Sequence, residues 1–77
     1  MPADLPAWIY DHRRAIGQRV QQHRIEANLT QEQLVELSGL DRSTLQRIEA
    51  GSRDPRLSWL QLVARALGVP LAELLAE

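Results

Sequence analysis

The chain contains no cysteine, and this absence excludes both disulfide bonds and thiolate metal sites. Its apolar stretches fall far short of the roughly 20 residues that a membrane-spanning helix needs. Residues 1–11 also lack the apolar run that a signal peptide requires. The absence of cysteine suits a reducing compartment, so we expect a soluble cytoplasmic protein that has no association with a membrane.

Strand signals are missing too, because no stretch sustains an alternation of apolar and polar residues. The 77 residues suffice for one domain at most. A domain of this size hardly encloses the substrate pocket of about 300 Å³ that an enzyme needs. No pairing of a nucleophile with a base stands out in the sequence. We therefore expect a single all-α domain that is not an enzyme.

Capping residues and glycines divide the chain into an N-terminal arm over residues 1–10 and a helical domain over residues 11–77. Thr30 and Gln33 have the spacing of a capping box, and Ser58 with Gln61 repeats this form. Leu37 is expected to point inward beside Leu34. The predicted helices cover approximately residues 11–27, 31–37, 41–50, 58–67 and 71–76, and Asp41 is the predicted cap at the start of the third.

Lysine is absent, and all nine basic residues are arginine. The net charge is −1, but residues 12–56 carry eight arginines against six acidic residues, an excess of two positive charges. Arginine binds phosphates and guanine edges in a bidentate manner, which favours contact with nucleic acid. A GC-rich genome would produce the same bias, so both explanations stay open.

Two of the predicted helices, 31–37 and 41–50, meet at a turn that contains Gly39. This is the form of a helix-turn-helix, whose second helix is free to enter a major groove. The outward positions of that second helix all carry side chains that form hydrogen bonds: Arg42, Ser43, Thr44, Gln46 and Arg47. Such a face suits the reading of base edges, although an ordinary solvated helix face remains the alternative.

The run from Leu29 to Gly51, LTQEQLVELSGLDRSTLQRIEAG, resembles the phage repressor and Cro family, also called the XRE family. The resemblance continues through Ala66-Leu67-Gly68-Val69 and covers approximately residues 12–76. It implies a compact five-helix bundle of the lambda-repressor-like DNA-binding type, in which the second and third helices form the helix-turn-helix.

The same resemblance implies roles for individual residues. Gln31 matches a position that contacts a DNA phosphate at a helix N-terminus, unless it only supports the cap. Arg42 and Arg47 are the first candidates for reading guanine, although either could contact phosphate instead. Arg53 and Arg56 match positions that contact the DNA backbone, with simple solvation as the alternative.

Arg24 and Glu49 match an ion pair of the family that links the first helix to the third, and a direct DNA contact is the weaker alternative. No metal or cofactor is expected, since His12 and His23 lie about 16 Å apart along a helix. We expect a sequence-specific regulator, a repressor above all, that binds double-stranded DNA as a homodimer. The alternative is a protein-interaction module such as an antitoxin or anti-regulator component.

A dimer surface is expected at the last helix, with help from the arm. The residues that suggest it are the apolar side chains Leu71, Leu74 and Leu75, together with Trp8, Ile9 and Tyr10.

Overall fold

The computed structural model describes residues 4–76, and within this range it contains five helices and no strand. The predicted all-α architecture is therefore confirmed. Residues 1–3 of the predicted arm and Glu77 lie outside the described residues. The helices are α1 (Ala7–Glu26), α2 (Gln31–Ser38), α3 (Arg42–Ala50), α4 (Leu57–Leu67) and α5 (Leu71–Leu75).

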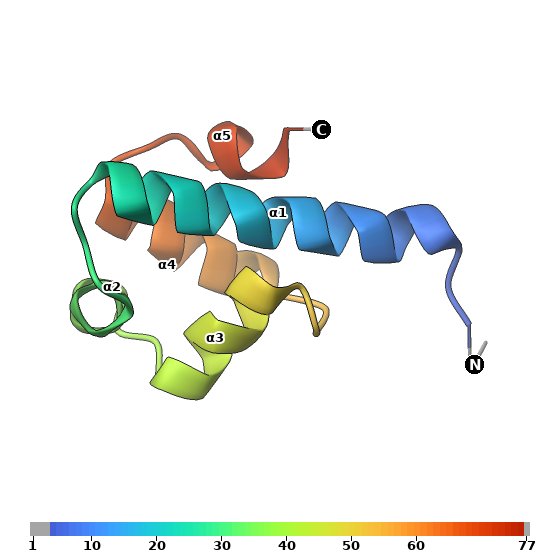
Figure 1. The fold of residues 1–77 in the computed structure, drawn as a ribbon, viewed down its shortest axis with the longest axis horizontal. Helices are drawn as coiled ribbons and strands as arrows, with labels where there is room; N and C mark the ends of the chain where they lie inside the picture. The colour runs from blue at the N-terminus through green and yellow to red at the C-terminus, as the bar shows by residue number, and fades with distance from the viewer. Residues whose placement is uncertain (1–3, 77) are drawn as a thin grey trace.

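The long helix α1 crosses the molecule, and the other four helices gather around its C-terminal part (Figure 1). α1 packs against α3, α4 and α5, while α2 packs against α3 and α4. The first turns of α1 extend beyond the rest of the bundle, and the described structure including these turns is 37 Å in its longest dimension. α2 and α3 lie together on one side of α1, where they form the helix-turn-helix.

Side-chain caps fix the starts of both helices of this motif. The Thr30 hydroxyl accepts a hydrogen bond from the Gln33 N–H at 3.1 Å, and the Gln33 side chain accepts one from the Thr30 N–H at 2.8 Å. Asp41 caps α3 by accepting from the Thr44 N–H at 3.2 Å. The turn between the helices depends on Gly39, whose φ of 78° favours glycine. The predicted capping box and turn are confirmed.

Two predicted helix starts are wrong. α1 begins at Ala7, about one turn before the predicted start, because Pro6 takes the N-cap position and its carbonyl accepts from the Ile9 N–H at 3.0 Å. Residues 7–10 are therefore helical and do not belong to an arm. α4 begins at Leu57 with Arg56 as its N-cap and no side-chain capping bond, so Ser58 lies inside the helix.

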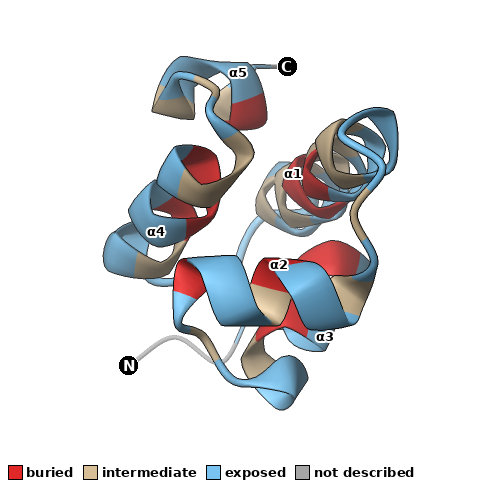
Figure 2. Ribbon diagram, turned by 90° about the vertical axis from the view of Figure 1, so that its left-hand side faces the viewer, coloured by how far each residue is buried: buried red, intermediate tan, exposed pale blue. Residues whose placement is uncertain are grey.

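The core consists of apolar side chains that all five helices direct inward, as the buried segments in Figure 2 show. Leu37, which was predicted to point inward, is 59% exposed. The buried stripe of α2 runs through Leu34 and Ser38, which lie four residues apart, and this stripe leaves Leu37 outside. The buried core residues are Ile16, Val20, Leu34, Leu45, Ile48, Leu60, Val63, Ala64 and Leu74.

Close backbone contact between α1 and the end of α3 sets the position of α3. A Cβ atom at Gly17 would lie 2.4 Å from the Ile48 carbonyl oxygen, and one at Gly51 would lie 2.6 Å from the Arg14 Cα. Real Cβ atoms do not approach other atoms so closely. The two glycines therefore let α1 and α3 touch backbone to backbone, which holds the outer face of α3 in a fixed orientation.

Candidate nucleic-acid interface

A nearly buried ion pair joins α1 to α3. Arg24 Nε lies 2.8 Å from Glu49 Oε2, and Arg24 Nη2 lies 3.2 Å from Glu49 Oε1. The two side chains are only 11% and 5% exposed. Arg24 Nη1 also donates to the Leu29 carbonyl at 3.0 Å. The pair predicted from the sequence therefore connects both helices with the turn that leads into α2.

Gln31, the first residue of α2, extends this network to a third helix. Its Nε2 donates to Glu49 Oε1 at 3.0 Å. The side chain is thus bound to α3 and plays no part in the Thr30 cap, which is the alternative role considered from the sequence. The helix-turn-helix pattern in the sequence does not predict the bond between Gln31 and Glu49. The two residues are brought together only by the packing of α2 against α3.

The start of α2 can receive an anion. The Thr30 cap engages the Gln33 N–H, and the described hydrogen bonds include no acceptor for the N–H groups of Gln31 and Glu32. Free N–H groups at a helix start carry partial positive charge and bind phosphate well. This geometry is what a phosphate contact at Gln31 requires.

The outward face of α3 carries the predicted hydrogen-bonding side chains. Thr44 is partly buried, whereas the other four are exposed. Hydrogen bonding with Thr44 lowers the pKa of the Asp41 carboxyl below its ordinary value, and the positive charge of Arg47 lowers it further. Asp41 is therefore ionised at neutral pH. The four exposed side chains are Arg42, Ser43, Gln46 and Arg47.

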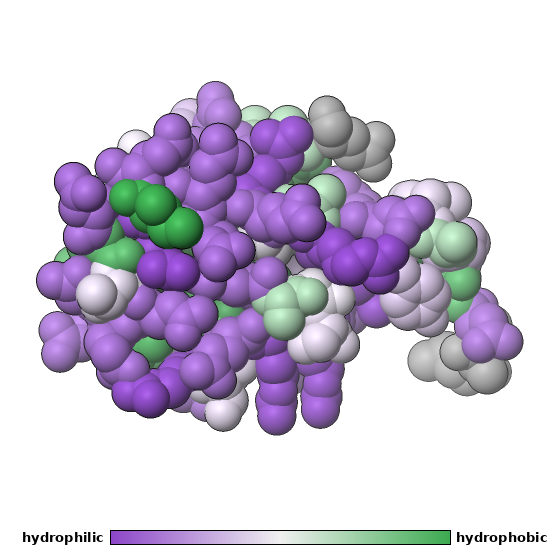
Figure 3. Space-filling view, in the orientation of Figure 1, coloured by the Kyte–Doolittle hydropathy of each residue, from purple (hydrophilic) through white to green (hydrophobic). Residues whose placement is uncertain are grey.

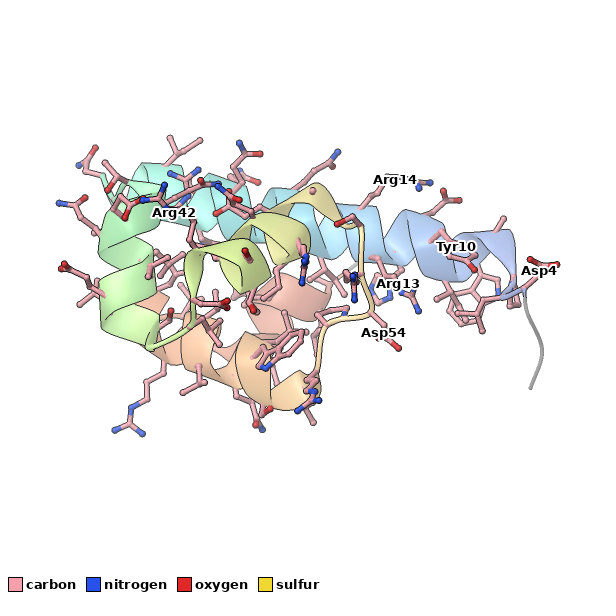
Figure 4. All side chains as sticks on the ribbon, turned by 90° about the horizontal axis from the view of Figure 1, so that it is seen from below. Asp4, Tyr10, Arg13, Arg14, Arg42 and Asp54 are labelled. Atoms are coloured by element: carbon pink, nitrogen blue, oxygen red, sulfur yellow. The ribbon has the colours of Figure 1, made fainter. Side chains whose placement is uncertain are left out.

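Arg42 does not stand alone at the start of α3, because its Nη2 forms an ion pair with the Glu32 carboxylate of α2. Both side chains are well exposed. Figure 4 shows Arg42 on one side of the molecule, and Arg13 of α1 beside Asp54 of the loop farther toward the N-terminal end of α1. No motif in the sequence indicates that Arg42 pairs with an acidic residue.

The loop after α3 holds the other two predicted contacts. Arg53 is exposed. Arg56 places its guanidinium 5.3 Å from the centre of the Trp59 ring, a cation–π contact. Arg13 was not considered from the sequence, yet its Nη2 lies 3.4 Å from Asp54 Oδ2 and thereby ties the loop to α1.

Two other features of the described part of the chain are the grouping of its potential metal ligands and the apolarity of its helices. No group of three or more histidine, aspartate or glutamate side chains gathers within residues 4–76 as metal ligands would. Within the same residues, none of the helices has the length and apolarity needed to cross a bilayer.

Comparison with known proteins matches residues 20–74 to the helix-turn-helix family. The chain is 44% identical over 62 residues to the immunity repressor protein of Bacillus phage phi105, covering 80% of this chain and 43% of that protein. It is 37% identical over 67 residues to the control protein C.SmaI of Serratia marcescens, covering 87% of this chain and 80% of that protein.

Solved structures of regulators also resemble this chain in fold. The restriction-modification controller protein C.AhdI from Aeromonas hydrophila superposes with a TM-score of 0.78 at 36% identity, over 90% of this chain and 98% of that one. The N-terminal DNA-binding domain of SinR from Bacillus subtilis superposes with a TM-score of 0.78 at 34% identity, over 83% of this chain and 94% of that one.

This chain therefore belongs to the helix-turn-helix family of transcriptional regulators, in the branch that includes phage repressors and controller proteins. The family resemblance, the all-α fold and the absence of an enzymatic role predicted from the sequence are confirmed. The chain spans less than half the length of the phage repressor and most of the length of the control protein.

Proposed function

We propose that this protein is a sequence-specific repressor that inserts α3 into the major groove of double-stranded DNA. One observation carries the proposal: the exposed face of α3 bears hydrogen-bonding side chains. The bond of Gln31 to Glu49 at 3.0 Å supports it, because it fixes the start of α2 against α3. A rigid pair of helices offers one end to phosphate and one face to base edges. The expected location is the cytoplasm, where this DNA would be found.

The proposed contacts divide into two kinds. Arg42 and Arg47 read guanine through its O6 and N7 atoms, and Ser43, Thr44 and Gln46 contact neighbouring bases or the backbone. Gln31, Arg53 and Arg56 contact phosphates, which position the protein without reading sequence. Trp59 supports Arg56 in this role because the stacked guanidinium still has donors free at its edge.

Binding as a homodimer would place two recognition helices in successive major grooves about 34 Å apart on a near-palindromic site. Leu74 is fully buried in the monomer, so it cannot contribute to the dimer surface as the sequence suggested. Of the side chains suggested from the sequence, Trp8 is 63% exposed and Tyr10 is also exposed at the projecting end of α1, and Leu5, just before the helix, is exposed beside them. Pale and green surface marks this end in Figure 3.

We place the dimer contact on this end of α1 together with the neighbouring edge of α5. A shallow apolar recess there is lined by Trp8, Asp11, His12 and Ala15. His12 Nε2 lies 3.1 Å from the Leu75 carbonyl oxygen, so the two helices form one continuous surface. A twofold interface needs one self-complementary patch, and a large aromatic side chain beside a recess provides both halves of such a patch.

The same exposed end supports a second candidate, a module that binds a different protein, as an antitoxin or anti-regulator component does. Arg47→Ala and a deletion of residues 1–11 distinguish the two functions. Loss of activity in Arg47→Ala with an unchanged melting temperature identifies DNA reading as the mechanism. Loss of activity only in the deletion variant, in a protein that still folds and still binds DNA, identifies binding of a different protein.

Selection of bound sequences from random double-stranded DNA, at low and at near-physiological salt, tests the proposal. We expect a palindromic motif that persists at the higher salt, because base contacts depend on salt less than phosphate contacts do. Binding that disappears at the higher salt without any motif would contradict sequence-specific function.

A further inference from the structure

The ion pair between Glu32 and Arg42 lies within the proposed reading face. Glu32 is the second residue of α2 and Arg42 is the first residue of α3. The pair therefore bridges the starts of both helices of the motif. We propose that Glu32 is a specificity-determining residue, which holds the Arg42 guanidinium in one orientation for guanine and discourages its use on phosphate. This inference rests on the proposed DNA-binding function.

The chemistry of the guanidinium supports such a role. Arg42 engages Glu32 through Nη2, and a guanidinium has five donors in a rigid plane. The remaining donors can meet the O6 and N7 acceptors of guanine while the carboxylate holds the plane. An arginine that is already ordered loses less side-chain freedom when it binds. An exposed ion pair adds little to fold stability, so removal of this pair should leave the melting temperature nearly unchanged.

The local charge acts in the same direction. Arg42 is flanked by Glu32 and by the ionised Asp41 that caps α3. These three residues sum to one negative charge. The two carboxylates therefore weaken the attraction of the Arg42 guanidinium for a phosphate, while Arg47 offsets part of the charge of Asp41. They weaken the contact of Arg42 with the neutral edge of a base much less. Sequence-independent binding depends on phosphate neutralisation, so this arrangement raises the ratio of specific to non-specific affinity.

A matched pair of variants tests the inference. Glu32→Gln removes the charge and the ion pair, whereas Glu36→Gln removes the same charge one turn further along α2, where the described residues show no ion pair. Both variants and the wild type are subjected to the selection on random DNA, and their affinities for unrelated duplex are measured. Their melting temperatures are compared to show that each protein is folded.

We expect the wild type and Glu36→Gln to select the same motif. Glu32→Gln should lose about 5-fold or more of the preference for guanine at one position in each half-site, and its affinity for unrelated duplex should rise more than that of Glu36→Gln. An unchanged motif in Glu32→Gln would overturn the inference while leaving the proposed function intact. A wild type that selects no motif would contradict the proposed function, and the inference with it.

A second comparison separates positioning from direct contact. Arg42→Ala and the double variant Glu32→Gln/Arg42→Ala should select the same motif, because Glu32 acts through Arg42. If Glu32→Gln still changes the motif when Arg42 is alanine, Glu32 touches the DNA itself and the positioning role is wrong.

Discussion

Gln31, the first residue of α2, donates its side-chain amide to Glu49, near the end of α3, at 3.0 Å. Glu49 also receives two hydrogen bonds from Arg24 of α1. One nearly buried carboxylate therefore joins three helices. The start of α2 and the outward face of α3 are held as one unit, which suits recognition of a DNA groove of fixed dimensions.

Removal of the Arg24 side chain tests how much this network contributes to the stability of the fold. Arg24→Ala leaves Glu49 buried without its main partner, and we expect the free energy of unfolding to fall by about 3 kcal/mol. Urea denaturation of the wild type and the variant measures this change. Arg19→Ala, on the same helix and without a described ion pair, serves as the control. An Arg24→Ala protein that melts within a degree or two of the wild type would contradict this account.

Substitution of Gly17 by alanine is a useful test, because helix propensity and packing should change the stability of the protein in opposite directions. Glycine to alanine in a helix interior normally stabilises by up to about 1 kcal/mol. Here the new Cβ would lie 2.4 Å from the Ile48 carbonyl oxygen, so we expect Gly17→Ala to destabilise by about 1–3 kcal/mol. Thermal unfolding decides the sign, with Gln18→Ala at an exposed position as the control. A stabilised Gly17→Ala protein would show that α1 and α3 are not in such close contact.

The Asp41 cap predicts a dependence on pH. Because hydrogen bonding with Thr44 lowers the pKa of Asp41 in the folded protein, the carboxylate stabilises the fold above the unfolded pKa. That contribution is lost as the pH falls through the folded value. Asp41→Ala should therefore melt below the wild type at neutral pH, and the gap should close in acid. A gap that stays constant from neutral pH down to about pH 2 would refute a role for the ionised cap.

The proposed dimer surface is tested at Trp8. Because Trp8 is largely exposed, Trp8→Ala should leave the melting temperature of the monomer nearly unchanged. Loss of an interface aromatic should weaken self-association by about 10-fold or more. Sedimentation at a series of concentrations measures this effect, with Ile25→Ala, an exposed apolar site at the other end of α1, as the control. A wild type that stays monomeric at high micromolar concentration would rule out the dimer.

Local sequence signals predicted most of the fold. Thr30 with Gln33, Asp41 and Gly39 each act within a few residues of their own position, and each was located correctly. Both wrong helix starts arose where the helix begins without a side-chain cap, whereas the error at Leu37 arose from the way α2 packs. Pro6 starts α1 with no side-chain capping bond, and Arg56 starts α4 in the same way.

The contacts of the candidate site were harder to predict from the sequence than the helices, because they join residues that are distant along the chain. Nothing near Arg42 or Glu32 indicates that they pair across the turn. The bond from Gln31 to Glu49 and the contact of Arg13 with Asp54 likewise depend on how the helices pack. Only the family resemblance brought Arg24 and Glu49 together, since a spacing along the sequence cannot show that two charges meet.

DNA affinity of Arg47→Ala, measured on the selected motif at near-physiological salt, tests the central claim most directly. Arg65→Ala, an exposed arginine on α4, is the control, and the melting temperature of each protein is recorded. We predict that Arg47→Ala binds about 5-fold to 150-fold more weakly, with an unchanged melting temperature and an unaffected control. Equal affinities for the wild type and Arg47→Ala would contradict reading of DNA by the outward face of α3.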